Sequence, residues 1–251
     1  MSDKIKIRKK RVDQLLLDLG TVESLEQARQ LLLAGKVRIG TDHVVRNGAE
    51  MVKENADLQV IDDSPYVSRG AYKLLPALRT FLPDLTGMTG IDVGASTGGF
   101  TDLMLQSGAV KVYAIDSGRG QLHAKLRNDP RVECHEQTNA RTLPDDFIGT
   151  PADLVTMDVS FISVLALLPS INRFLRSGGH AFILVKPQFE ARREEVETGG
   201  VVRNPAIRQR CVDAVTTFCR DELTWQLLDA SPCAIKGPKG NQEYMCVFLK
   251  P

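Results

Sequence analysis

The feature that most constrains this chain is a glycine-rich turn between a short apolar run and an amphipathic segment. Residues 91–93 (Ile-Asp-Val) are predicted to form a buried strand, and residues 100–105 to begin a helix. Between them lies the sequence Gly-Ala-Ser-Thr-Gly-Gly, residues 94–99. A strand, a glycine turn and a helix in this order are typical of the first unit of a doubly wound α/β sheet, where the turn approaches a ligand closely.

The same alternation continues along the chain. Three further apolar strands are predicted at residues 111–115, 154–157 and 181–185, and they are followed by Asp116, Asp158 and Lys186. Repeated strand–helix units imply a mostly parallel sheet with helices on both faces. Because ligands of such sheets bind at the carboxyl ends of the strands, we expect the three charged residues to line one rim.

One connecting helix is predicted between the last two of these strands. Residues 163–175 carry a helical apolar pattern that contains Pro169, so we expect a single helix with a kink at the proline. Gly178 and Gly179 are expected to end it.

The glycine turn also restricts the ligand. It matches the dinucleotide pattern GxGxxG at Gly94 and Gly99, but Ser96 replaces the second glycine. That glycine lets the backbone approach a pyrophosphate, so its loss disfavours a nicotinamide dinucleotide. Asp116 follows Gly94 by 22 residues and can accept hydrogen bonds from ribose hydroxyls. A ribose-containing ligand without phosphates, such as S-adenosylmethionine, fits these residues better.

The first 64 residues are predicted to form a smaller α+β domain, with residues 65–251 forming the second domain. Apolar spacing predicts a helix at residues 12–19, and Ser24 with Gln27 forms a capping box for a second helix at residues 25–33. Short β-like runs follow at residues 37–39, 44–45 and 58–61, and turn-forming residues 62–65 mark the boundary.

Charge is concentrated at the start of the chain. The net charge is only +1, which excludes a uniformly basic coat for nucleic acid. Residues 1–11 nevertheless contain six Lys or Arg residues and one acidic residue. Such a run is either a solvated terminus or an arm that binds phosphates.

Other classes of protein are disfavoured. The longest nearly unbroken apolar stretch, residues 164–169, is far shorter than the roughly 20 residues of a membrane helix, and no signal peptide opens the chain. We therefore expect a cytoplasmic protein that does not insert stably into membranes. The five cysteines form no CxxC pair and the four histidines have no ligand spacing, so we predict no disulfide framework and no metal.

The first domain resembles S4 RNA-binding domains. The resemblance rests on Arg11-x-Asp13-x-Leu15-Leu16, on Ala28 with Leu31-Leu32, and on Gly35-x-Val37-x-Ile39. Leu25 departs from it, because that family usually has an arginine there. The resemblance implies RNA contacts, and a small helical module for protein contacts is the alternative. The basic residues expected to contact RNA are Arg8, Lys10, Arg11, Lys36 and Arg38.

The second domain resembles FtsJ-like, class I methyltransferases, and the whole chain resembles the TlyA family of rRNA 2′-O-methyltransferases, also called hemolysins. The matching stretches are SRGAYKL (residues 68–74), DVGASTGGF (92–100), DVSFIS (158–163), VKPQFE (185–190), GGVV (199–202) and GPxGNxEY (237–244). The resemblance implies a Rossmann-like fold and S-adenosylmethionine-dependent 2′-O-methylation of cytidine in 16S or 23S rRNA, or both, within ribosomal subunits.

The resemblance also implies the site residues. The family's catalytic Lys–Asp–Lys–Glu tetrad falls on Lys73, Asp158, Lys186 and Glu243. Phe161 and the segment 190–201 are implied to line the target nucleotide. Arg69, which is close to Lys73 in sequence, is expected to contact an RNA backbone phosphate. The residues implied to bind the cofactor are Asp92, Gly94, Ala95, Ser96, Thr97, Gly98, Gly99, Phe100, Asp116 and Asn139.

Two questions stay open at the level of sequence. Lys186 is either a neutral general base or a charged group that stabilises the developing alkoxide, with Asp158 or solvent receiving the proton. The alternatives for the whole chain are an RNA-binding protein with an inactive methyltransferase domain and a membrane-acting hemolysin.

Overall fold

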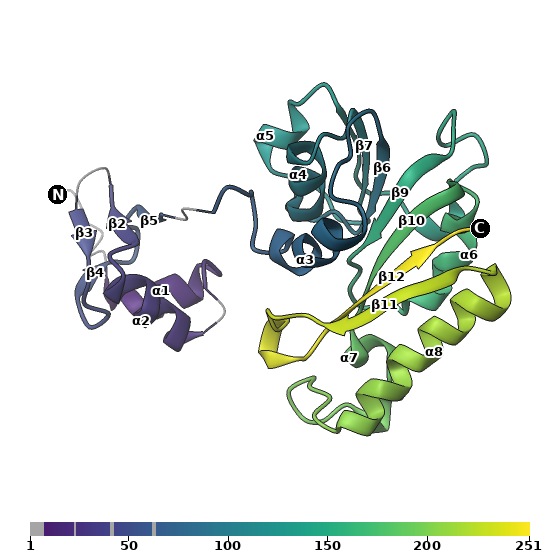
Figure 1. Ribbon diagram of the computed structural model, residues 1–251. Helices are drawn as coiled ribbons and strands as arrows, with labels where there is room; N and C mark the ends of the chain where they lie inside the picture. Colours follow the sequence, from purple (N-terminus) through teal and green to yellow (C-terminus); the bar gives the residue numbers. More distant parts are fainter. Residues whose placement is uncertain (1–7, 23, 41–42, 62–63) are drawn as a thin grey trace. The chain divides into compact units, whose positions relative to one another are not determined.

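The computed structural model describes residues 8–22, 24–40, 43–61 and 64–251. The chain divides into two compact units, Met1–Asp63 and Ser64–Pro251. Each unit has its own buried apolar residues, and Figure 1 follows the chain through both.

The N-terminal unit packs two short helices against small antiparallel sheets. Strands β3, β2 and β5 form one sheet in that order, and β1 pairs with β4. The predicted helix at residues 25–33 is confirmed, and the Ser24 hydroxyl accepts a hydrogen bond from the Gln27 amide at 3.1 Å. Strands β1 and β4 were not predicted, and β1, with the sequence Lys-Lys-Arg, has no apolar residue that could indicate a strand. The elements are β1 (Lys9–Arg11), α1 (Val12–Asp18), α2 (Leu25–Leu33), β2 (Val37–Ile39), β3 (His43–Val45), β4 (Met51–Lys53) and β5 (Leu58–Val60).

The C-terminal unit is built on a seven-stranded sheet with strand order β11-β12-β10-β9-β6-β7-β8. Strands β10, β9, β6, β7 and β8 are parallel to one another. At one edge, β12 pairs antiparallel with β10, and β11 pairs antiparallel with β12. The predicted mostly parallel α/β fold is confirmed. The strands are β6 (Thr89–Val93), β7 (Lys111–Ile115), β8 (Val132–His135), β9 (Ala152–Met157), β10 (Leu175–Val185), β11 (Gln226–Pro232) and β12 (Tyr244–Leu249).

Helices cover both faces of this sheet (Figure 1), as the alternating pattern predicts. Along β10, Ile183 and Val185 point into one core with α6 and α8, while Phe182 and Leu184 point into the other with α3 and α4. Successive side chains of a strand alternate between faces, so a continuously apolar strand belongs in the middle of such a sheet. The helices are α3 (Ala71–Phe81), α4 (Gly99–Gln106), α5 (Ala124–Arg127), α6 (Leu168–Asn172), α7 (Pro187–Glu190) and α8 (Pro205–Leu223), with 3₁₀ turns η1 (Ala140–Thr142), η2 (Val164–Ala166), η3 (Arg193–Glu195) and η4 (Pro238–Gly240).

The predicted single helix at residues 163–175 is wrong. The segment is divided into η2 and the five-residue helix α6, and Leu175 already begins β10. Pro169 lies in the first turn of α6, where its missing amide hydrogen costs nothing, so it starts a helix instead of kinking one. Gly178 and Gly179 lie inside β10, where the pairing register with β9 shifts between Leu175 and His180.

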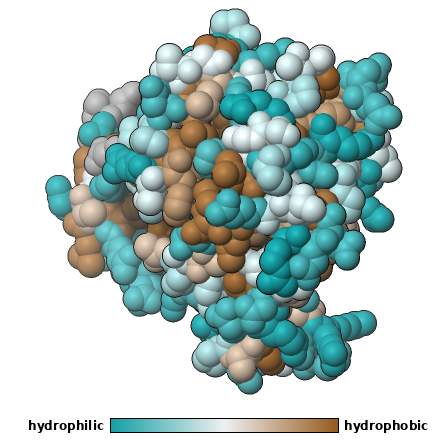
Figure 2. Space-filling model, turned by 45° about the vertical axis from the view of Figure 1, so that its right-hand side comes forward, coloured by the Kyte–Doolittle hydropathy of each residue, from teal (hydrophilic) through white to brown (hydrophobic). Residues whose placement is uncertain are grey.

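The exposed surface is mixed in character. Figure 2 shows one face of the molecule, on which hydrophilic side chains are interspersed with smaller hydrophobic areas. Within the described residues, no helix combines the length and apolar character needed to cross a membrane. Phe161 is the large hydrophobic side chain with the greatest exposure in that set, at 91%.

Candidate active site

The candidate site lies at the carboxyl ends of the central parallel strands. Asp116 follows β7, Asp158 follows β9, and Lys186 follows β10, so the rim expected from the sequence is formed. The glycine turn at residues 94–99 follows β6, between the strands that carry Asp116 and Asp158. A site at this edge combines residues that are far apart in sequence, and the strands of the central sheet fix their positions.

Two cavities that share lining residues open at this rim. The smaller, of about 180 Å³, lies over the glycine turn and contacts Ser68, Asp92, Asp158 and Lys186. The larger, of about 700 Å³, extends past Asp116. Gly94, Ser96, Asp158 and Ser160 line both, which makes the two cavities one continuous site. The larger cavity is also lined by Asn139, Phe161 and Ile162.

The glycine turn brings backbone close to backbone. Gly94 has φ +80°, and a Cβ there would lie 2.5 Å from the carbonyl oxygen of Asp158. Only glycine meets both demands without strain. A Cβ on Gly99 would lie only 2.9 Å from the amide nitrogen of Ala71. Because glycine has no Cβ, α4 can approach α3 this closely. Gly98 is not among the cavity-lining residues, since it packs against Leu126.

Asp92 is buried beneath the turn and ties α4 to β9. Its carboxylate accepts hydrogen bonds from the amide and hydroxyl of Thr101, at 3.0 and 2.7 Å, and from the hydroxyl of Thr156 at 3.0 Å. Burial raises the pKa of Asp92 to about 6, and the threonine hydrogen bonds oppose this shift. Asp92 therefore supports the turn as well as lining the smaller cavity.

Asp116 is held by the backbone of two loops. Its carboxylate accepts hydrogen bonds from the Ser96 amide at 2.8 Å and from the Gly118 amide at 2.7 Å. These bonds join the glycine turn to the segment after β7 and orient the carboxylate along the larger cavity. Asn139 also lines this cavity, and its neighbour Thr138 donates a backbone hydrogen bond to the Asp116 carbonyl at 2.9 Å. The Asn139 side chain accepts a hydrogen bond from the Arg141 amide at 3.0 Å and begins η1.

Glu136 is a residue of this region that the sequence did not reveal. Its carboxylate accepts hydrogen bonds from the amides of Gly120 at 2.6 Å and of Gln121 at 2.8 Å. Backbone hydrogen bonds, including one from the Leu122 amide, lower the pKa of Glu136 to about 2. Glu136 thus fixes the loop whose Gln121 lines the larger cavity. Three of its donors are backbone amides and the fourth is the Arg127 guanidinium at 2.7 Å, which also lowers the pKa. Backbone donors leave no local pattern in the sequence that marks the contact.

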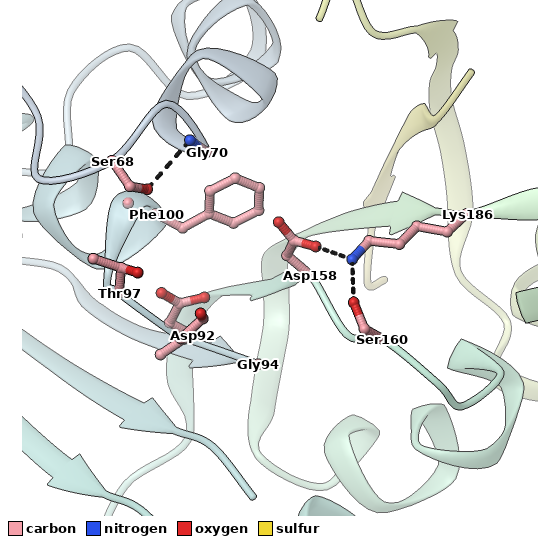
Figure 3. Close-up of a pocket in the computed structure, with 12 residues that line it drawn as sticks. Ser68, Gly70, Asp92, Gly94, Thr97, Phe100, Asp158, Ser160 and Lys186 are labelled. Carbon is pink, nitrogen blue, oxygen red and sulfur yellow. Dashed lines mark hydrogen bonds and ion pairs between the residues drawn. The ribbon is translucent and has the colours of Figure 1, made fainter. Parts of the chain in front are cut away.

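Lys186 reaches from the end of β10 to the segment after β9 (Figure 3). Its Nζ lies 2.6 Å from an oxygen of Asp158 and 2.8 Å from the hydroxyl of Ser160. The Lys186 side chain is only 8% exposed, and that of Asp158 is 21% exposed. Phe100 directs its ring toward the same opening in Figure 3. The amine and carboxylate therefore meet at the mouth of the smaller cavity, where a ligand can still reach them.

Lys73 and Glu243 form a second ion pair beside the first. Nζ of Lys73 lies 2.7 Å from an oxygen of Glu243, whose side chain is fully buried. Burial lowers the pKa of Lys73, but the carboxylates of Asp158 and Glu243 raise it by more, so its net pKa lies above the ordinary value. The four residues of the expected tetrad thus lie together as two amines and two carboxylates.

The residues expected to contact RNA differ in their surroundings. Arg8, Arg38 and Arg69 are exposed, and so is Phe161. Lys10 instead pairs with Asp18, and Arg11 pairs with Asp13 at 2.6 Å. Half-buried Lys36 lies on the same unit. Lys4 and Lys6 of the basic run fall outside the described residues.

Metal-binding groups do not gather at this rim. Across the described parts of the chain, there is no cluster of three or more His, Cys, Asp or Glu residues that could hold a metal ion. Four of the cysteines are buried, Cys134 is half-buried, and all five are free thiols.

Comparison with known proteins gives consistent matches. The model of the FtsJ-like methyltransferase family matches residues 66–250. The 16S/23S rRNA (cytidine-2′-O)-methyltransferase TlyA of Mycobacterium tuberculosis is 44% identical over 239 residues, which cover 94% of this chain and 88% of that protein. Hemolysin A of Brachyspira hyodysenteriae is 35% identical and covers 95% of this chain and 99% of its own length. A solved structure from Streptococcus thermophilus, described as a proposed hemolysin, is 39% identical with a TM-score of 0.79, covering 97% of this chain and 89% of that one.

Proposed function

Because the chain belongs to the family of FtsJ-like methyltransferases, in the group that contains TlyA and hemolysin A, we propose that it methylates the 2′-hydroxyl of cytidine in ribosomal RNA. The observation that carries this proposal is the Lys186–Asp158 pair at the mouth of the cavity over the glycine turn. The pair places an amine and a carboxylate where a hydroxyl must lose its proton during methyl transfer.

S-adenosylmethionine fits the cavities as methyl donor. The close approach at Gly94 leaves a backbone-lined cradle, and Asp116 lies along the larger cavity with its carboxylate oriented by two amides. A carboxylate in this position suits ribose hydroxyls. Asn139 lines the same cavity. When bound, S-adenosylmethionine supplies a sulfonium-activated methyl group, so the protein needs to align the acceptor oxygen and manage one proton.

We assign Lys186 the electrostatic role. Its amine donates to Asp158 and Ser160, which supports a charged ammonium directed at the mouth of the cavity. An ammonium there stabilises the alkoxide that develops on the 2′-oxygen as the proton leaves. Asp158, 2.6 Å from Lys186, is assigned the role of accepting that proton or passing it to solvent.

Lys73 and Glu243 set the charge of the site. Both carboxylates of the cluster raise the pKa of Lys73, so Lys73 remains charged at neutral pH. We assign Lys73 the role of a fixed cation that keeps Asp158 oriented, and buried Glu243 the role of holding Lys73 in place. Removing either partner of such a buried pair would leave a buried charge without compensation and would destabilise the folded protein.

The N-terminal unit and the rim of the catalytic unit are proposed to hold the ribosomal subunit. Arg8 and Arg38 on the first unit and Arg69 on the second are exposed cations suited to phosphates, which give affinity without reading sequence. Exposed Phe161 lines the larger cavity and offers a ring on which an unstacked base can lie. Because ribosomal subunits are the proposed substrate, we expect the protein to act in the cytoplasm.

The test is to incubate the pure protein with S-adenosylmethionine and isolated ribosomal subunits, and to analyse the RNA nucleosides by mass spectrometry. We expect 2′-O-methylcytidine, produced only when protein and methyl donor are both present. Methylation at another nucleoside would correct the substrate, and absence of any methyl transfer would contradict the proposal. Leakage of liposomes exposed to the protein would instead support the membrane activity that the name hemolysin suggests.

A further inference from the structure

The segment that carries Phe161 has an unusual backbone. Phe161 has φ +65°, in the left-handed region that non-glycine residues seldom adopt. Its side chain is 91% exposed, and its ring centroid lies 5.3 Å from that of Phe189 at an interplanar angle of 51°. A strained and exposed residue persists only where the surrounding structure holds it.

The segment is held at both ends by the short helix α7 and the residue before it. On one side of Phe161, Nζ of Lys186 donates to the Ser160 hydroxyl at 2.8 Å. On the other side, the Glu190 carboxylate accepts hydrogen bonds from the Ser163 hydroxyl at 2.5 Å and the Val164 amide at 2.9 Å. Phe161 therefore lies between two anchored points, Ser160 and Ser163.

The Glu190 contact is not needed to cap the start of the 3₁₀ turn η2. Ser163 already caps η2 by accepting a hydrogen bond from the Leu165 amide. Glu190 is half-buried, and burial raises its pKa while the bonds from Ser163 and Val164 oppose the shift. Partial burial of a carboxylate carries a desolvation cost, which the two hydrogen bonds offset here.

We propose that Glu190 is a positioning residue that holds the Ser163–Val164 end of this segment and so presents the Phe161 ring to the base of the target nucleotide. This inference rests on the proposed function. Lys186 precedes α7 and Glu190 is its last residue, so this one short helix positions the residues that align the acceptor ribose and its base. Glu190 itself touches neither the base nor the methyl donor in this arrangement.

A double-mutant cycle tests the proposal, with KM for ribosomal subunits and kcat measured for Glu190→Ala, Phe161→Ala and the double variant. Because Glu190→Ala removes both hydrogen bonds that hold the Ser163–Val164 end of the segment, we expect it to raise KM about ten-fold. We expect Glu190→Gln, which keeps one acceptor oxygen, to lie between wild type and Glu190→Ala. In the Phe161→Ala background, Glu190→Ala should have no further effect.

Glu222→Ala is the control, because it removes an exposed carboxylate of α8 that lies outside segment 190–201 and outside both cavities, and it should leave KM unchanged. Effects of Glu190→Ala and Phe161→Ala that multiply, or a Phe161→Ala variant with wild-type KM, would overturn the proposal. If Glu190→Ala does not fold, the same cycle run with Glu190→Gln decides in the same way. Absence of methyl transfer by the wild type would refute the proposed function, whereas an active wild type with multiplying effects refutes only the role of Glu190.

Discussion

Replacing Gly94 by alanine tests whether the close approach of the glycine turn to Asp158 sets the geometry of the site. Gly94 and Gly87 have nearly the same backbone conformation, with φ +80° and +78°. A Cβ on Gly87 would meet nothing within 4 Å, whereas a Cβ on Gly94 would lie 2.5 Å from the Asp158 carbonyl oxygen. Gly87→Ala is therefore a control that carries the backbone strain without the collision.

The magnitudes follow from these contacts. The left-handed conformation costs an alanine about 1–2 kcal/mol, so we expect Gly87→Ala to lower the free energy of unfolding by that amount or less. Ordinary contact begins at 3.4 Å, so in Gly94→Ala the Asp158 backbone must move by 0.9 Å, the difference from 2.5 Å. Overpacking of this kind adds about 1–3 kcal/mol. A displacement of about 1 Å at a catalytic group is expected to lower kcat about 100-fold.

Urea unfolding gives the stability of both variants, and methyl transfer to ribosomal subunits gives their kcat. We expect Gly87→Ala to keep wild-type kcat and Gly94→Ala to lose most of it while still folding. Equal kcat values in the two variants would refute the reasoning, because backbone strain alone would then account for the whole effect. Calorimetric titration with S-adenosylmethionine separates lost cofactor binding from displaced chemistry.

Three further variants probe charged side chains around the site. Asp92 has a pKa raised from 3.8 to about 6, so stability should fall by up to about 3 kcal/mol as pH rises through that range, and Asp92→Asn should abolish this slope in urea titrations. Glu136 has a pKa lowered from 4.5 to about 2, so its contribution is complete above pH 4.5 and lost toward pH 2; Glu136→Gln should speed amide hydrogen exchange at residues 120–122 at neutral pH. Lys73→Met should cost about 3–5 kcal/mol of unfolding free energy by leaving Glu243 buried without a cation, and adding Glu243→Gln should recover part of it; an unchanged Lys73→Met midpoint would contradict the buried pair.

The strands at the centre of the sheet were predictable from local sequence. Strands β7, β9 and β10 are mostly apolar runs followed by one charged residue, and burial on both faces of a parallel sheet favours such runs. Strand β6 differs, because it contains Asp92 and is followed by Gly94. The rim formed by Asp116, Asp158 and Lys186 follows from the pattern of β7, β9 and β10, because parallel strands end at the same edge.

Contacts between distant segments were not predictable. Glu190 and Ser163 are 27 residues apart, and Glu136 binds backbone amides about 15 residues before it. Neither carboxylate has a neighbour in sequence that suggests a partner. The prediction for segment 163–175 was wrong for another reason. A proline can kink a helix or begin one, and Pro169 lies in the first turn of α6. A glycine pair can end a helix or lie in an irregular strand, and Gly178 and Gly179 lie in β10.

The central claim is that Lys186, paired with Asp158 beside the glycine turn, drives methyl transfer. Its most direct test is the single-turnover rate of labelled methyl transfer from S-adenosylmethionine to ribosomal subunits, compared between wild type and Lys186→Ala. We predict transfer by the wild type and a rate at least about 100-fold lower in Lys186→Ala, with cofactor affinity retained. Equal rates for the two proteins would contradict the claim.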